Sequence, residues 1–403
     1  MSRKLFSLKE VSEISGLSIA TINKKIKSGE LQKTGDCFHI DNLLNFENFK
    51  NIKNSRWEDF INIKPQNNYS IIELFAGAGG LAIGMESAGF KGILFNEINK
   101  KACDTLKANR PEWNVINQDI TQLDFTEYEG KVDVISGGFP CQSFSYVGKR
   151  LGLMDTRGTL FFEFARAIKE VKPKVFLAEN VKGLLNHDNG KTIEVIKNVI
   201  SELDYVFLDM KVLNSMFYRV PQKRERLFII GIRKDLFKDQ VIKWPDYYHK
   251  IYTMNDVLFN GELYCGDVPE SPKQLYPQKK YEVMKHVPEG GYWKDLPLDM
   301  QKSYMKKSFY SGGGKTGIAR RLSLDSPCLT LTCSPAQNQT ERCHPIETRP
   351  LSTREYARVQ TFPDDWIFSG STTAIYKQIG NAVPVNLAYA VGKSLVNLLN
   401  SIK

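Results

Sequence analysis

The chain alternates mostly apolar runs with polar or small-residue segments, and each apolar run ends abruptly. Four of these runs have the length of buried strands: residues 71–75, 92–95, 132–135 and 175–178. A helix is expected after the first strand, over residues 81–88, and an amphipathic helix over residues 386–399 should pack beside that strand. Strands that alternate with helices predict a doubly wound α/β sheet, in which ligands and chemistry collect at the carboxyl ends of the strands.

The first 45 residues follow a helical period instead. Apolar residues recur at three-residue steps in a first helix, at Leu8, Val11, Ile14 and Leu17. Ser7 is placed to cap this helix and Gly16 to end it, and a basic second helix begins after Ser18. With a small strand near residues 38–40, residues 1–45 resemble the winged helix-turn-helix of excisionase-like and MerR-like regulators. A small interaction domain or a plain helical hairpin stays open, and residues 46–69, rich in Asn and Lys, are expected to form a linker.

Composition narrows the class of partner. The 403 residues carry a formal net charge of +10 with a pI near 9.0, which favours a polyanion although charge alone does not identify one. Seven cysteines, an odd number without framework spacing, indicate reduced thiols in a cytosol. The amino-terminal residues lack the apolar core of a signal peptide, and no apolar run reaches the ~20 residues of a membrane helix. We therefore expect a soluble cytoplasmic protein with no membrane partner.

Small residues and carboxylates follow the first strands at their carboxyl ends. Residues 76–80, AGAGG, predict a turn almost without side chains, where a ligand can approach the backbone at the positive end of the next helix. The spacing is not GxGxxG, so a dinucleotide is not indicated. Glu97 is placed to bind ribose hydroxyls, and Asp119 to hold an adenine amino group. Either carboxylate alone could be a solvated loop residue, but three successive strand ends in order predict a nucleotide-like cofactor.

Candidate catalytic residues stand at two further strand ends. Cys141 follows the strand 132–135 in the segment Phe139-Pro140-Cys141-Gln142, and its thiolate would be a nucleophile if cations lie near it. Glu179 follows the strand 175–178, where burial would favour its protonated form. Arg224 and Arg226 are expected on one face of a strand, because side chains alternate. Taken singly, these residues leave the alternatives of an incidental cysteine, an ordinary carboxylate and a solvated basic turn open.

Together these motifs resemble the DNA (cytosine-5) methyltransferase family of the bacterial restriction-modification type. The matching segments are FAGAGG, NE, QDI, GGFPCQSFS, DTRGTLFFEFARAI, FLAENVKGLL, VPQKRERLFIIGIR, RPLSTREYARVQTFPDDW and YKQIGNAVPVNLAYAVG. The resemblance implies a doubly wound, Rossmann-like S-adenosylmethionine-dependent methyltransferase domain over residues 70–234 and 349–403, with an inserted target-recognition region at 235–348. It also implies S-adenosyl-L-methionine as cofactor, double-stranded DNA as partner, a monomer on DNA and a cognate restriction endonuclease acting on the same sequence.

The resemblance assigns the chemistry as well. Cys141 would add to C6 of a flipped cytosine and Glu179 would hydrogen-bond its N3, while Arg224 and Arg226 would meet cytosine O2 and a nearby phosphate. Cofactor contacts are carried over to Phe75, Ala76, Gly77, Gly79, Gly80, Glu97, Ile98, Asp119, Ile120, Pro140, Leu160, Asn381 and Val383. Contacts with DNA or the target base fall to Phe139, Gln142, Ser145, Lys149 and Arg157. Many relatives have an aromatic residue at the position of Ile98, so one apolar contact with adenine is looser here.

The remaining stretches carry weaker signals. Residues 235–348 fit no catalytic pattern, which leaves the recognition sequence undefined, and residues 311–316 resemble a phosphate loop except that Phe309 stands where the first glycine belongs. We expect no metal site, because no paired CxxC occurs among Cys328, Cys333, Cys343 and His344. An RNA cytosine-5 methyltransferase and a DNA-binding regulator remain as alternatives. For residues 1–45 the hypothesis is that they bind a separate operator and are dispensable for methylation.

Overall fold

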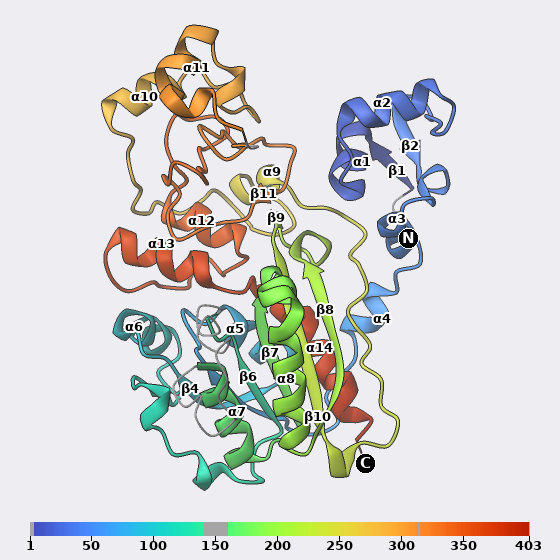
Figure 1. Ribbon diagram of the computed structural model, residues 1–403, viewed down its shortest axis with the longest axis vertical. Helices are drawn as coiled ribbons and strands as arrows, with labels where there is room; N and C mark the ends of the chain where they lie inside the picture. The colour runs from blue at the N-terminus through green and yellow to red at the C-terminus, as the bar shows by residue number, and fades with distance from the viewer. Residues whose placement is uncertain (1–3, 141–159, 313–314, 403) are drawn as a thin grey trace.

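The computed structural model describes residues 4–140, 160–312 and 315–402. Its centre is a seven-stranded sheet with the order β5-β4-β3-β6-β7-β10-β8 (Figure 1). Five neighbouring strands are parallel, and β10 runs antiparallel to both β7 and β8. The strands are β3 (Ser70–Leu74), β4 (Lys91–Asn96), β5 (Val115–Ile116), β6 (Val134–Gly137), β7 (Val175–Val181), β8 (Tyr205–Asn214) and β10 (Glu225–Arg233).

Helices cover both faces of this sheet, which confirms the doubly wound α/β fold. In Figure 1, α7 (Leu160–Val171) and α8 (Lys191–Glu202) lie in front of the sheet, and α14 (Val385–Asn400) lies behind it beside α5 (Gly80–Ala88). Because side chains alternate along a strand, Ile71 packs in the cluster with α5 and α14, while Ile72 packs in the cluster with α7 and α8. A further helix, α6 (Lys100–Asn109), follows β4.

Among the described residues, one helical stretch is long and apolar enough to cross a membrane, and it belongs to this core. Residues Thr372–Asn400 have the length and composition of a membrane span, with a mean hydropathy of 1.2, but 78% of the most apolar window is buried inside the protein. The stretch is divided into α13 (Thr372–Asn381) and α14. The amphipathic helix expected over residues 386–399 is therefore a helix that packs on α5 beside the first strand of the sheet.

The amino-terminal lobe, residues 4–45, has the expected helices. It contains β1 (Leu5–Ser7), α1 (Leu8–Ser15), α2 (Ile19–Lys27) and β2 (Cys37–His39). Ser7 caps α1 in a reciprocal pair with Glu10, and Gly16 ends the helix with a left-handed φ of 74°. The predicted strand near residues 38–40 lies at 37–39 and pairs antiparallel with β1, which sets Phe6 opposite Phe38.

The expected polar linker at residues 46–69 is wrong. This segment forms α3 (Glu47–Lys53) and α4 (Trp57–Ile61), whose apolar side chains are at most 4% exposed at Phe49, Ile52, Trp57 and Phe60. Apolar residues are few here, but they recur at helical steps and so fall on one buried side of each short helix. Trp57 meets Tyr248 edge-on with 5.4 Å between ring centroids. The amino-terminal lobe is therefore joined to the catalytic domain by packed helices, which we call the bridge.

The expected recognition region forms a second lobe with little regular structure (Figure 1). It has a core of its own, built around Tyr276, Met284, Trp293 and Met305. The short strand β11 (Cys328–Leu329) pairs in parallel with β9 (Gln222–Lys223) and so ties this lobe to the catalytic domain. Its helices are α9 (Met254–Leu258), α10 (Gln278–Met284) and α11 (Leu298–Met305), and α12 (Thr353–Val359) follows the return to the catalytic domain.

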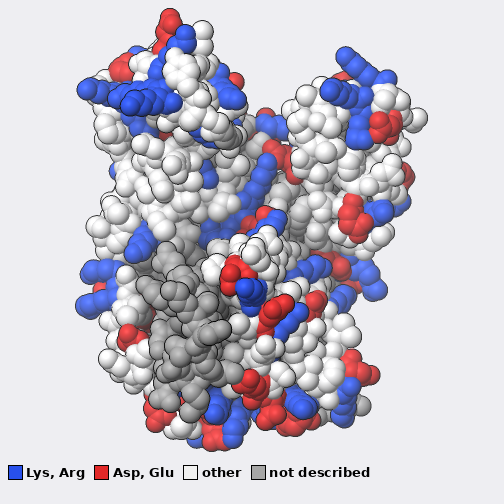
Figure 2. Space-filling view, viewed as in Figure 1, with Lys and Arg blue, Asp and Glu red and all other residues white. Residues whose placement is uncertain are grey.

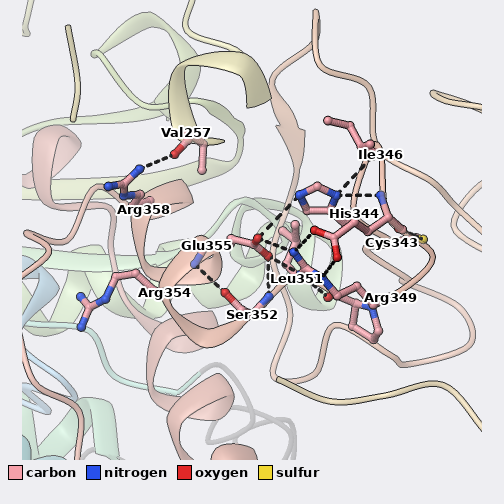
Figure 3. Close-up of polar contacts among 12 residues, drawn as sticks. Val257, Cys343, His344, Ile346, Arg349, Leu351, Ser352, Arg354, Glu355 and Arg358 are labelled. Atoms are coloured by element: carbon pink, nitrogen blue, oxygen red, sulfur yellow. Dashed lines mark hydrogen bonds and ion pairs between the residues drawn. The ribbon is translucent and has the colours of Figure 1, made fainter. Parts of the chain in front are cut away.

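A buried polar cluster fixes the chain where it leaves the recognition region (Figure 3). Arg349 donates to both carboxylate oxygens of Glu355 at 2.8 Å. Ser352 and Glu355 form a capping box at the start of α12. The Nδ1 atom of His344 accepts hydrogen bonds from the backbone N–H groups of residues 346 and 347, and its Nε2 lies 3.6 Å from Glu355. His344, considered above as a metal ligand, thus has backbone partners on one side of its ring and a carboxylate on the other.

Candidate active site

The carboxyl ends of four parallel strands come together at one edge of the sheet. The register sets Leu74 at the end of β3 beside Asn96 of β4 and Gly137 of β6, and Gly137 in turn beside Ala178 of β7. The next residues along the chain are Phe75, Glu97, Gly138 and Glu179, so residues from four separate motifs meet there. This is the edge where doubly wound sheets bind ligands.

A cavity of about 640 Å³ opens at this edge, within the ~300–1,000 Å³ range of small-molecule sites. It is lined by fourteen of the residues predicted above: Phe75, Ala76, Gly77, Gly80, Glu97, Ile98, Phe139, Pro140, Leu160, Glu179, Arg224, Arg226, Asn381 and Val383. The expected cofactor residues and the expected base-contacting residues therefore line one continuous space.

The glycine turn forms the cradle at one end of the cavity. The backbone N–H of Gly77 donates to Glu97 Oε2 at 2.8 Å, and Glu97 Oε1 accepts from the N–H of Asn99 at 2.7 Å. A Cβ on Gly80 would lie 2.2 Å from the carbonyl oxygen of Val383, so only glycine allows the chain to return this close. Glu97 thus holds the turn against β4, and the close approach at Gly80 brings the start of α14 to the cavity.

An ion pair occupies the other end. Arg226 Nε lies 2.9 Å from Glu179 Oε1, and both side chains are 12% exposed. Burial raises the pKa of Glu179 above its ordinary value, although Arg226 and Arg224 oppose that shift. A Cβ on Gly138 would lie 2.8 Å from Glu179 Oε2, so the glycine leaves room for this carboxyl group. The site therefore holds a carboxyl group that burial drives toward its protonated form beside a fixed positive charge.

Arg224 lies elsewhere than the sequence indicated. It falls between β9 and β10, so the strand expected over residues 222–226 is interrupted there. Its guanidinium is buried and donates to the carbonyl oxygens of Leu331, Gly380 and Ala382 at 2.9–3.0 Å. Because its Nη donors are engaged with backbone and its Nε alone is without a partner among the described residues, this geometry does not favour the expected contact with cytosine O2 or a phosphate, which stays a prediction. Arg224 instead ties the recognition region to the segment between α13 and α14.

Phe139 is also placed differently. Its side chain is 2% exposed and packs against Phe161 and Phe164, with ring centroids 5.3 and 5.8 Å away. The ring of Phe139 therefore lies in the core under α7, although the residue lines the cavity, and its predicted contact with the target base stays a prediction. Its carbonyl oxygen accepts a hydrogen bond from Asn180 Nδ2 at 2.8 Å. That bond anchors the start of the segment that leads to Cys141.

Three predicted cofactor residues do not line the cavity. Gly79 faces Leu106 and Trp366, which a Cβ would meet at 2.8 and 3.1 Å. Asp119 accepts hydrogen bonds from the backbone and hydroxyl of Thr121, and Ile120 is 3% exposed in the core. Short side chains and carboxylates after a strand are common as turn caps, and that is the role of Asp119 in this structure.

Five of the expected residues lie outside the described part of the chain. They are Cys141, Gln142, Ser145, Lys149 and Arg157. The described residue Pro140 lines the cavity and immediately precedes Cys141.

Among the lining residues that the sequence reasoning missed are two buried polar residues that lie within strands, Asn180 and Glu73. Asn180 stands next to Glu179 and is 5% exposed. Glu73 lies inside β3 and is 2% exposed; its Oε2 accepts no hydrogen bond from the described residues, and burial raises the pKa of this carboxyl well above its ordinary value. The signal was present in both cases, because a polar residue within a buried apolar strand needs a partner.

Known proteins resemble this chain along most of its length. Residues 69–397 match the family described as C-5 cytosine-specific DNA methylase. The chain is 58% identical to the Type II methyltransferase M.Eco47II of Escherichia coli, over 100% of this chain and 98% of that protein. It is 61% identical to the Type II methyltransferase M.PspPI of a Psychrobacter strain, over 90% of this chain and 87% of that protein. The solved structure of a DNA modification methyltransferase encoded within an Escherichia coli prophage gives a TM-score of 0.59 at 27% identity, over 83% of this chain and 100% of that one.

Proposed function

Since this chain belongs to the C-5 cytosine-specific DNA methylase family, it transfers a methyl group from S-adenosylmethionine to C5 of cytosine in DNA, and we propose that Cys141, Glu179 and Arg226 act on the base. This activity replaces the two alternatives that the sequence left open, an RNA cytosine-5 methyltransferase and a DNA-binding regulator without catalytic activity. The observation that carries the assignment of residues is the Glu179–Arg226 pair, which lines the same cavity as the glycine cradle.

Cytosine C5 is a poor nucleophile while the ring is aromatic, so the ring must first be activated. The Cys141 thiolate forms a bond to C6, the electron pair of the C5–C6 double bond shifts toward N3, and Glu179 gives N3 a proton. C5 of the resulting enamine would then take the methyl group from the sulfonium sulfur of S-adenosylmethionine, whose S–CH3 bond breaks to leave S-adenosylhomocysteine as a neutral thioether. Loss of the C5 proton to water then re-forms the double bond, the Cys141 thiolate leaves C6, and Glu179 recovers its proton.

The burial of Glu179 suits this exchange. Burial raises its pKa above the ordinary value, while Arg226 at 2.9 Å favours the ionised form, so the environment of this carboxyl group opposes neither the protonated nor the ionised state alone. Arg226 also brings positive charge to the region where the base and the Cys141 thiolate would meet, which favours the thiolate. Arg224 acts indirectly in this proposal, as a positioning residue between the recognition region and the cofactor side.

The residues at the other end of the cavity fit S-adenosylmethionine. The bound group would supply a methyl on a positively charged sulfonium. Glu73 has a buried carboxyl oxygen without a partner among the described residues, and such an oxygen can accept a contact from a cationic ligand. Gly77, which also lines the cavity, belongs to the turn that is almost without side chains. Glu97 would bind the ribose hydroxyls and Ile98, 67% exposed at present, would cover the adenine. Phe75, Leu160, Pro140, Asn381 and Val383 complete the expected contacts.

The relatives support a narrower assignment. The two bacterial proteins compared above are both Type II methyltransferases. The chain would accordingly methylate one specific duplex sequence in the bacterial cytosol, at the nucleoid, as a monomer and in company with an endonuclease that cuts the same sequence when it is unmethylated. The recognition lobe would read that sequence from the major groove.

Two measurements test the proposal. Bisulfite sequencing of DNA from a host that expresses the protein should find 5-methylcytosine at one position of one short sequence, and Cys141→Ser should abolish it while S-adenosylmethionine still binds. A duplex with 5-fluorocytosine at that position should form an adduct that survives denaturation, because fluorine cannot leave as a proton does. Full activity of the serine variant, or an adduct that mass spectrometry locates on another cysteine, would remove Cys141 from the mechanism.

A further inference from the structure

We propose that the amino-terminal lobe is a fixed arm of the DNA-binding face, and that helix α2 contacts the sugar–phosphate backbone of the target duplex outside the recognition sequence. The inference rests on the proposed function, because it assumes that duplex DNA lies at the active site. It differs from the expectation that residues 1–45 bind a separate operator on a tether.

The bridge is the first reason. Asn48 Nδ2 in α3 donates to the carbonyl of Ile14 in α1 at 2.8 Å, which joins the bridge to the lobe. At its other end Arg56 N donates to Asp246 at 3.3 Å, and Lys393 of α14 donates to the carbonyl of Ile63 at 2.8 Å. The lobe, the bridge and α14 share one continuous apolar cluster. A unit built for independent movement would not be packed along its connection in this way.

Helix α1 provides the second reason, because it contacts both the recognition lobe and strand β9. Lys9 Nζ donates to Ser323 of the recognition lobe at 2.7 Å and lies 3.8 Å from Asp325. Glu13, one turn further along the same helix, forms an ion pair with Lys223, which stands three residues before Arg226. The amino-terminal lobe is thus docked where the recognition lobe pairs with β9, the short strand that precedes the strand of Arg226.

The third reason is the surface that this docking leaves exposed. Ile22 of α2 is buried, while Asn23, Lys24 and Lys27 are exposed, and none of the ion pairs among the described residues involves either of these lysines. Figure 2 shows the amino-terminal and recognition lobes as two projections with an open hollow between them, and Lys and Arg side chains both on the floor of the hollow and on the outer end of the amino-terminal lobe.

Phosphate is the group that such a surface recognises. Exposed lysines without carboxylate partners release counterions when they meet a polyanion, and their contribution does not depend on base sequence. Because the lobe is docked beside the active site, the polyanion within its reach is the duplex that the site itself holds. The lobe would therefore add affinity for long DNA without changing which sequence is methylated.

The test compares two target duplexes, one barely longer than the recognition sequence and one extended on each side by two helical turns, about 20 bp. Fluorescence anisotropy gives the dissociation constants for the wild type and for the double variant Lys24→Glu/Lys27→Glu. The control is Lys91→Glu/Lys169→Glu, which reverses the charge of two exposed lysines outside the amino-terminal lobe. Lys91 begins β4, and Lys169 lies in the last turn of α7. Thermal unfolding verifies that each variant is folded.

The wild type and the control should bind the long duplex more tightly than the short one, and this ratio should fall by about tenfold in the α2 variant, with a salt dependence shallower by about two charges. A hydroxyl-radical footprint should shrink on one flank of the site. The proposal is overturned if the ratio equals that of the wild type, or if the variant loses only binding to its own promoter DNA. Failure of the proposed function would look different, because the wild type would then bind neither target duplex specifically.

Discussion

Arg226 reaches across from β10 to Glu179 on β7, with 2.9 Å between its Nε atom and Glu179 Oε1. The antiparallel register sets Phe228 opposite Glu179 and Arg226 opposite Val181. Arg226 is therefore displaced along the sheet from Glu179 by one pair of residues on the same face. A long side chain is needed to span that displacement, and arginine supplies both the reach and a permanent charge. The pairing of two strands thus fixes the proton-bearing group of the site.

The first prediction concerns the proton on Glu179. Glu179→Gln keeps the shape of the side chain but cannot exchange a proton with N3, so kcat should fall by about 10²–10⁴-fold while DNA binding persists. Because burial raises the pKa of Glu179, its protonated form is present below that raised pKa and is lost as the pH rises through it. The wild-type profile of kcat against pH should therefore contain a falling limb that is absent from the glutamine variant.

The matched control is Glu225→Gln, which alters an exposed carboxylate at the start of the neighbouring strand β10, where it pairs with Lys182. Single-turnover assays on a saturating duplex should leave this control at the wild-type rate. An equal loss of rate in both variants would point to general damage to the paired strands β7 and β10 and would contradict the proton role of Glu179.

The second prediction separates Arg224 from Arg226. Arg224→Met keeps a similar apolar volume but leaves three buried carbonyl acceptors without their donor, each at a cost of about 1–3 kcal/mol. Urea unfolding should therefore show a large loss of stability, and calorimetry a weaker affinity for S-adenosylmethionine. If the variant unfolds like the wild type and loses only turnover, Arg224 contacts the base directly and our positioning role is wrong.

The third prediction contrasts two carboxylates that the sequence treated alike. Glu97→Ala removes the acceptor that faces the cavity and holds the N–H of Gly77, so affinity for S-adenosylmethionine should fall by about 1.5–3 kcal/mol. Asp119→Ala should change that affinity much less, because Asp119 caps Thr121 and does not line the cavity. Isothermal titration calorimetry measures the affinity of both variants for S-adenosylmethionine. Equal losses of affinity would mean that Asp119 contacts the cofactor as well.

The sequence predicts the position of a site residue where the neighbouring residues in the chain determine that position, and it fails where distant residues determine it. Glu97 and Glu179 both line the cavity, because Glu97 directly follows β4, Glu179 stands near the carboxyl end of β7, and parallel strands bring these ends to one edge; the strand expected over residues 175–178 continues past Glu179 to Val181. Arg224 could not be placed in this way, because its three partners lie at residues 331, 380 and 382, far away in the chain. The pattern at residues 222–226 shows alternation but not the break in the strand, which depends on those distant carbonyls.

The bridge shows a different kind of failure. Its overall composition is polar, and composition suggested a linker. The informative signal was spacing, since Phe49, Ile52 and Trp57 need only short helices to face a common core. These side chains pack on a surface that includes Tyr248, which comes after the whole first part of the catalytic domain in the sequence. The local pattern of residues therefore does not reveal that surface. Tertiary packing here overrides a weak local preference.

The last prediction concerns the junction drawn in Figure 3. Burial alone would raise the pKa of Glu355, but its paired hydrogen bonds with Arg349 and the nearby His344 hold that pKa below the ordinary value. A carboxyl group whose pKa is depressed by folding stabilises the fold above its unfolded pKa, about 4.3, and that stabilisation is lost as the pH falls through the folded value.

Glu355→Gln should therefore destabilise the protein at neutral pH by about 3–5 kcal/mol, because it leaves the buried charge of Arg349 without this partner. The control is Glu347→Gln, which removes the other carboxylate paired with Arg349; that side chain is 56% exposed, so its loss should cost much less. Urea unfolding measured from pH 7 down to about pH 3 should show the gap between wild type and Glu355→Gln staying level near neutral pH and narrowing once the pH falls below the unfolded pKa. A gap that stays constant with pH would mean that the charge of Glu355 does not hold the junction, and that the side chain contributes through its packing and its cap on α12 alone.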